Sequence, residues 1–148
     1  MMPKDLISYH ISQALKRAKI SIFYLEGGMI SEASKEAQKS WRHIMATFLV
    51  LSLYQSSKEP PKYRSVPKSK IFSISKSLQD KGYEDLVKLS ALYYALTNEI
   101  PNSEKKILIS TLIEEELIHV KKWFRELWNE DYEKELNNIL EELKKISK

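Results

Sequence analysis

The chain has 148 residues, no cysteine and a formal net charge of +4. This length suits one domain with a substantial core, and the lack of cysteine excludes disulfides and thiolate zinc sites. The charge is uneven, because residues 1–81 carry 14 Lys and Arg against 6 Asp and Glu, whereas residues 82–148 carry 10 against 14. A basic half and an acidic half indicate either a nucleic-acid-binding face or electrostatically complementary self-association.

The chain shows no pattern of a secreted or membrane protein. Its first residues lack the order of charged, apolar and small residues that marks a secretory signal, so we expect a cytoplasmic location. The longest apolar run, residues 43–54, is shorter than the roughly 20 residues that cross a bilayer. Abundant Lys and Glu without Cys also fit a thermophilic source.

The first predicted helix spans Pro3 to Glu26. Seven residues fall within about 100° of arc and form a core stripe: Ile7, Ile11, Ala14, Leu15, Ala18, Ile22 and Leu25. Tyr9, Ile20 and Phe23 lie on the opposite side and form a second apolar patch, interrupted by Lys16. Exposed patches of this kind mark contacts, so we expect a homodimer that uses these three residues.

The second predicted helix, Ile30 to Gln55, is the one around which the chain is organised. Its apolar stripe covers about 80° of arc and comprises Ile30, Ala33, Ala37, Trp41, Ile44, Phe48 and Leu51. Gly27 and Gly28 end the preceding helix, and Ser31 is the predicted N-cap of this one. So short a connection predicts a helical hairpin.

Prolines at 60, 61 and 67 predict a loop over Ser56–Ser69. A short helix with Ile71, Ile74 and Leu78 on one side should follow and stop at Gly82. The next helix, about Tyr83–Thr97, is apolar over a wide arc and should be buried.

Two further helices are predicted towards the end of the chain. Pro101 ends the preceding helix, and Asn102 or Ser103 should cap a helix that runs to about Trp128. The last, Asp131 to about Lys145, is either separate or continuous with it. We expect Trp128, like Trp41 and Trp123, to lie in the core.

These segments contain no strand periodicity, no internal repeat and no low-complexity tract, so the predicted fold class is all-α, an antiparallel bundle of five or six helices. We expect one domain over residues 1–148. It comprises a long helical hairpin over about 3–56, a basic proline-rich loop at 57–68, and three or four helices in 69–148.

The hairpin carries a resemblance to a known family. Residues 24–26 (YLE) lead through the glycine turn into 31–41 (SEASKEAQKSW), and residues 91–96 (ALYYAL) form an aromatic-rich helix later in the chain. This arrangement resembles the HEPN superfamily of helical nucleotide-associated domains, and within it the archaeal PaREP families. The likeness extends loosely over residues 10–125.

The resemblance implies an antiparallel bundle that often dimerises and acts as a toxin ribonuclease or as the partner of a nucleotidyltransferase. The ribonuclease members use an Arg followed four to six residues later by a His. Here His43 directly follows Arg42, and His119 precedes Arg125, so the signature is missing. We therefore expect a non-catalytic interaction module with a protein partner such as a nucleotidyltransferase.

Glu116 and His119 form an E-x-x-H pair on one predicted helix, a spacing that carboxylate metal sites of helical bundles use. Neither His10 nor His43 has a glutamate three residues earlier, so the second pair of such a site is missing, and we expect no bound metal and no cofactor. Glu116 lies at the centre of an apolar stripe and must be buried. Its partner is expected to be His119 or the hydroxyl of Tyr93 or Tyr94. The pair is a weak candidate for catalysis and otherwise structural.

The region from Lys58 to Lys76 carries six positive residues against Glu59 alone. The candidates for contact with phosphates or another anion are Lys58, Lys62, Tyr63, Arg64, Lys68 and Lys70. Such a loop could hold phosphates while the tyrosine stacks on an unpaired base, or it could be a solvated loop. Three hypotheses thus stand: a dimeric interaction module, a nucleic-acid-binding protein, and an enzyme or metal protein centred on Glu116 and His119.

Overall fold

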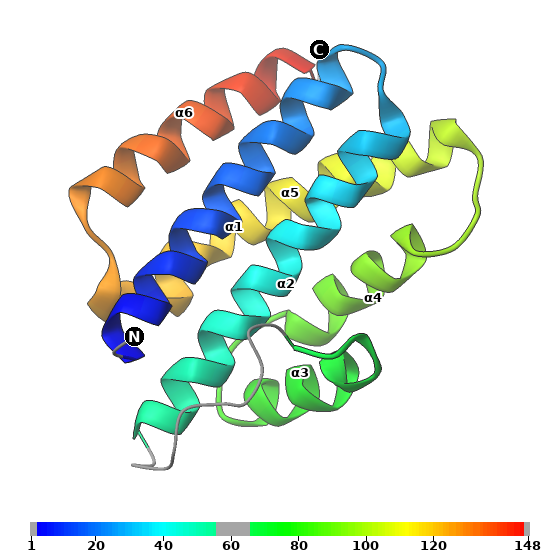
Figure 1. Cartoon of the computed structure of the whole chain (residues 1–148). Coiled ribbons are helices and arrows are strands. Elements are labelled where there is room, and N and C mark those ends of the chain that lie inside the picture. The colour runs from blue at the N-terminus through cyan, green and yellow to red at the C-terminus, as the bar shows by residue number, and fades with distance from the viewer. Residues whose placement is uncertain (1–2, 56–65, 147–148) are drawn as a thin grey trace.

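The computed structural model describes residues 3–55 and 66–146, and every regular element within them is helical (Figure 1). The six α-helices are α1 (Pro3–Glu26), α2 (Ile30–Gln55), α3 (Ile71–Asp80), α4 (Leu86–Leu96), α5 (Asn102–Trp123) and α6 (Glu130–Ile146). Short 3₁₀ helices lie at Lys68–Lys70 and Arg125–Leu127. The predicted all-α bundle is confirmed.

The helices α1 and α2 lie side by side and are joined by a tight turn in which the chain reverses direction (Figure 1). Gly28 adopts the left-handed conformation, with φ of 75°. The N–H of Met29 donates to the carbonyl of Tyr24 at 2.9 Å, and that of Gly28 to the carbonyl of Leu25 at 3.1 Å. This is a Schellman stop, and it accounts for the predicted end of the first helix. The predicted cap was wrong, since α2 begins before Ser31.

Small residues let α1 and α2 approach closely. Ala14, Ala18, Ala33 and Ala37 are all at most 2% exposed. Buried serine hydroxyls connect the two helices in both directions: Ser21 Oγ donates to the carbonyl of Ala33 at 2.7 Å, and Ser40 Oγ to the carbonyl of Ala14 at 2.8 Å. The hairpin is therefore held by main-chain contacts that larger side chains would prevent.

The core surrounds α2, which packs against α1, α4 and α5, while α6 covers the other side of α1 (Figure 1). Trp41 and Phe48 are at most 1% exposed. The ring of Trp41 lies edge-on to Trp123 at 5.9 Å, and Phe48 contacts Phe124 at 4.7 Å between ring centroids. The predicted stripes of the first two helices lie in this core, and Trp128 packs at its edge.

Two predicted boundaries were wrong. Helix α4 begins at Leu86 rather than Tyr83, because Gly82 and Asp85 both have positive φ, 109° and 63°, and form a turn first. Helix α5 ends at Trp123, five residues before the predicted Trp128. Phe124 leaves the helical region with ψ of 34°, and α6 is consequently a separate helix.

The start of α5 also differs from the prediction. Pro101 occupies the N-cap position, and its carbonyl accepts bonds from the N–H groups of Glu104 and Lys105, so neither Asn102 nor Ser103 caps the helix. At α6, by contrast, Asn129 caps through its side chain, with Oδ1 accepting from the N–H of Tyr132 at 2.9 Å. This cap fixes the direction in which α6 returns along α1.

Candidate functional site

Glu116 is buried on α5, as the position of the residue in the apolar stripe predicted. It is 1% exposed. Burial raises its pKa to about 8, and the hydrogen bond shared with Ser40 only partly opposes this. The predicted partners were wrong: the only hydrogen bond of the Glu116 side chain within the described residues is to Ser40 on α2, and Oε1 has no partner there.

The geometry around Ser40 fixes the protonation state of Glu116. Ser40 Oγ lies 2.8 Å from the carbonyl oxygen of Ala14 and 2.7 Å from Glu116 Oε2. A hydroxyl has one proton, and a carbonyl can only accept. Both contacts are hydrogen bonds only when Ser40 donates to Ala14 and a protonated Glu116 donates to Ser40. With its pKa raised to about 8, Glu116 is therefore a neutral acid at pH 7.

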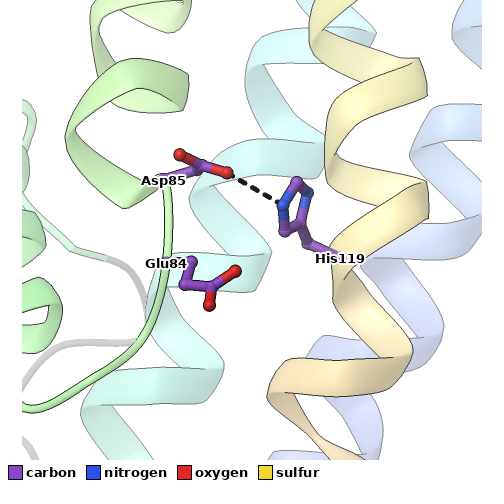
Figure 2. Close-up of side chains that lie close together, drawn as sticks. All are labelled: Glu84, Asp85 and His119. Carbon is purple, nitrogen blue, oxygen red and sulfur yellow. Dashed lines mark ion pairs between the residues drawn. The ribbon is translucent and has the colours of Figure 1, made fainter.

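His119 lies on the same helix but points away from Glu116. It faces the turn that precedes α4, where its Nε2 lies 3.0 Å from Asp85 Oδ2 (Figure 2). Its Nδ1 lies 2.8 Å from the main-chain carbonyl of Glu115. Residues three apart in a helix do not point in the same direction. Glu116 therefore faces α2 in the core, whereas His119 faces the turn before α4 at the edge of the bundle.

Glu84 joins Asp85 and His119 in one cluster (Figure 2). One ligand-type atom from each of the three residues lies within 4.8 Å of the other two. Trp123 contacts two members of the cluster: its ring stacks on His119 with centroids 5.3 Å apart, and its Nε1–H donates to the Glu84 carbonyl at 3.2 Å. The sequence analysis missed Glu84 and Asp85, because no local spacing links them to a histidine more than thirty residues away.

The predicted dimer residues lie on the outer side of α1. Phe23 is 69% exposed and Tyr9 is 47% exposed, while Ile20 is half-buried. Beside Phe23, between α1 and α6, is a hollow of about 140 Å³ lined by Lys19, Ile22, Phe23, Glu26, Ile139 and Glu142.

Much of the predicted basic contact region, including Lys58, Lys62, Tyr63 and Arg64, lies outside the described residues. Lys68, Lys70 and Lys76 are exposed on the described side of this region. Lys68 Nζ lies 5.9 Å from the ring centroid of Tyr94, and that ring stacks on exposed Phe72 with centroids 4.5 Å apart. Lysines and an exposed aromatic ring, Phe72, are thus adjacent at the start of α3.

The remaining histidines pair with each other. His10 on α1 and His43 on α2 are joined through their Nδ1 atoms at 2.9 Å. Burial, assisted by the nearby charges of His10, Arg17 and Arg42, lowers the pKa of His43 to about 4, and burial lowers that of His10 as well. His43 is therefore a neutral member of the helix contact, although Arg42 directly precedes it.

Within residues 3–55 and 66–146, none of the helices is both long and apolar enough to cross a membrane. No protein-family model, curated protein or solved structure matches this chain.

Proposed function

We propose that this chain is a non-catalytic helical interaction module that forms a homodimer through the outer face of α1. The observation that carries the proposal is the 69% exposure of Phe23 beside an apolar hollow. Together the ring and the hollow form an exposed apolar patch, and burying such a patch against a partner removes a large apolar area from water.

A second copy of the chain suits this surface because a two-fold interface brings the same patch together from both molecules. The patch holds both a protruding ring, Phe23, and a hollow formed with Ile22 and Ile139. Each ring can therefore enter the hollow of the other copy. Around the hollow, Lys19 of one copy would face Glu26 or Glu142 of the other, which gives opposite charges at the rim.

The available area supports this arrangement. Helices of 24 and 17 residues expose outer faces of roughly 600 Å² together, taking 1.5 Å per residue and a width of about 10 Å. This is of the same order as the ~800 Å² that each partner contributes to a stable interface. A contact centred on Phe23 also keeps Lys16, which interrupts the patch, away from the two-fold axis.

The resemblance to HEPN proteins extends the proposal to fold and partner. We infer an antiparallel HEPN-like bundle that works with a separate protein such as a nucleotidyltransferase, in a toxin–antitoxin-like or regulatory system. The close hairpin of α1 and α2, through Ala14 and Ala37, supports the likeness. Co-expression with a nucleotidyltransferase encoded beside this gene should yield a complex of defined stoichiometry, and two separately eluting proteins would contradict the inference.

The dimer is tested by the mass in solution. We expect light scattering at tens of micromolar to give about twice the chain mass of 17.4 kDa for the wild type. Phe23→Glu should give a monomer, because it places a charge in the apolar contact. Ile118→Glu is the matched control, since Ile118 is 58% exposed on α5, and it should remain dimeric. A monomeric wild type, or equal masses for the two variants, would overturn the proposal.

A second candidate function is binding of single-stranded nucleic acid near the start of α3. The exposed ring of Phe72 beside Lys68 and Lys70 favours it, because rings stack on unpaired bases while lysines contact phosphates. Changing Lys62, Arg64 and Lys68 together to Glu should weaken binding of every RNA sequence alike, and affinity should fall steeply with salt. Fluorescence anisotropy with a labelled oligonucleotide would measure both, and a flat salt response would favour a solvated loop.

A further inference from the structure

We propose that Glu84, Asp85 and His119 form a binding site for a divalent transition-metal ion of the zinc class. The site lies between the turn before α4 and the last turns of α5 (Figure 2). It is independent of the outer face of α1 and needs no second copy of the chain.

The hydrogen bonds of His119 point to a shared cation. The Glu115 carbonyl can only accept, so Nδ1 of His119 must carry a proton and donate to it at 2.8 Å. In a neutral ring, Nε2 is then a lone pair, yet it lies 3.0 Å from a carboxylate oxygen of Asp85. Two lone pairs at this distance repel each other, so a second ring proton or a metal ion must lie between the two atoms.

The arrangement of the ring matches that of metal-binding histidines. In such sites the nitrogen that does not bind metal donates its N–H to a main-chain carbonyl or a carboxylate, which fixes the tautomer and the ring orientation. Here the Glu115 carbonyl has this role. The ring of Trp123 stacks on His119, whose side chain is only 14% exposed. These contacts hold Nε2 on the side of Glu84 and Asp85.

Trp123 also fixes the opposite side of the site. Its indole N–H donates to the Glu84 carbonyl, so one side chain positions both the imidazole and the main chain that carries the two acids. The left-handed conformation of Asp85, with φ of 63°, turns its carboxylate toward α5. Asp and Asn tolerate this conformation better than most residues.

The local charge favours a cation. The carboxylates of Glu84, Asp85 and Glu115 lie near His119. Lys88 pairs with Glu115 at 3.7 Å, and Lys122 pairs with Glu84 at 3.1 Å. Lys122 is 58% exposed on a flexible stem, so a metal ion can displace it from Glu84. Asp85 has no lysine or arginine partner among the described residues.

The ligand set selects the metal class. The imidazole nitrogen favours a transition metal over Mg²⁺ or Ca²⁺, and Zn²⁺ also accepts carboxylate oxygens. Zn²⁺ can take three protein ligands of these kinds and leave a fourth position for water. Each of the three residues offers one ligand atom.

Calorimetric titration of the full chain with Zn²⁺ tests the proposal. We expect one saturable site in the wild type, and a loss of affinity of roughly tenfold or more in His119→Gln and in Asp85→Asn, since each removes a ligand. Asp85→Asn keeps a residue that tolerates the left-handed conformation, and circular dichroism would verify the fold of both variants.

Two control variants make the result specific. His43→Gln removes another histidine, and Glu114→Gln removes an exposed carboxylate on α5. Both should bind Zn²⁺ as the wild type does, and so should monomeric Phe23→Glu, which separates this test from that of the dimer. No saturable binding by the wild type, or equal binding by His119→Gln and the wild type, would overturn the proposal.

Discussion

Ser40 Oγ lies 2.7 Å from Glu116 Oε2, which joins two residues 76 positions apart in the sequence. Because the same hydroxyl also donates to the Ala14 carbonyl, Glu116 must supply the proton of this contact. A carboxylic acid held neutral in this way connects α1, α2 and α5 at one point. Its protonation links the stability of the bundle to pH.

Stability should fall as pH rises toward 8, and Glu116→Gln should remove this effect. The pKa of Glu116 in the folded chain is raised to about 8 from a usual value of 4.5. Between these values the folded state holds a proton that the unfolded state has lost, so the contribution is complete below pH 4.5 and is lost as pH rises through 8. Urea unfolding at pH 6.5 and 8 should show a decrease of roughly 1–2 kcal/mol in the wild type.

The glutamine variant is a matched control for that measurement, since its amide can donate to Ser40 without titrating. Its free energy of unfolding should stay nearly constant between the two pH values once the contribution of the other titrating groups has been subtracted. Equal pH dependence in the two proteins would mean that Glu116 is charged in the fold.

Ser40→Ala should destabilise the bundle by about 1–3 kcal/mol, because it removes the only hydrogen-bond partner that the buried acid of Glu116 has within residues 3–55 and 66–146. Ser110→Ala is the comparison. The Ser110 hydroxyl makes an exposed hydrogen bond to the Lys106 carbonyl on its own helix, so this substitution should be nearly neutral. In a Glu116→Leu background the cost of Ser40→Ala should shrink. Chemical denaturation measures the wild type and the four variants, and an unchanged cost in the leucine background would contradict the coupling.

Acid should destabilise the contact between His10 and His43. The pKa of His43 is lowered to about 4 from 6.5, so the unfolded state takes up a proton first as pH falls. The contribution of this histidine is present above pH 6.5 and is lost as pH falls through 4. His43→Gln should therefore lose less stability than the wild type between pH 6.5 and 4.5, as measured by thermal melting. A steeper loss in the variant would contradict this.

The sequence predicted those features that depend on local pattern. The apolar stripes predicted which faces of α1 and α2 are buried, and Gly28 predicted the turn between them. The position of Glu116 within the apolar stripe of α5 predicted its burial. The end of α5 has no such signal, since neither proline nor glycine stands near Phe124, which leaves the helix to pack on Phe48.

The partners of the site residues depend on tertiary packing. Helical spacing suggested His119 as the partner of Glu116, but Ser40 comes from α2 and Asp85 from the turn before α4. These contacts follow from how α5 is placed between other helices. Ala14, Ser40 and Glu116 meet only because small residues allow α1 and α2 to approach each other closely.

The position of the dimer contact can be measured directly with spin labels. Because the chain has no cysteine, a single introduced cysteine is its only labelling site. Electron–electron dipolar measurements on Lys19→Cys, one turn from Phe23, should give a short distance between two copies. Lys122→Cys, on α5, should give a much longer one. No dipolar interaction at position 19, or a shorter distance at position 122 than at 19, would contradict a dimer built on the outer face of α1.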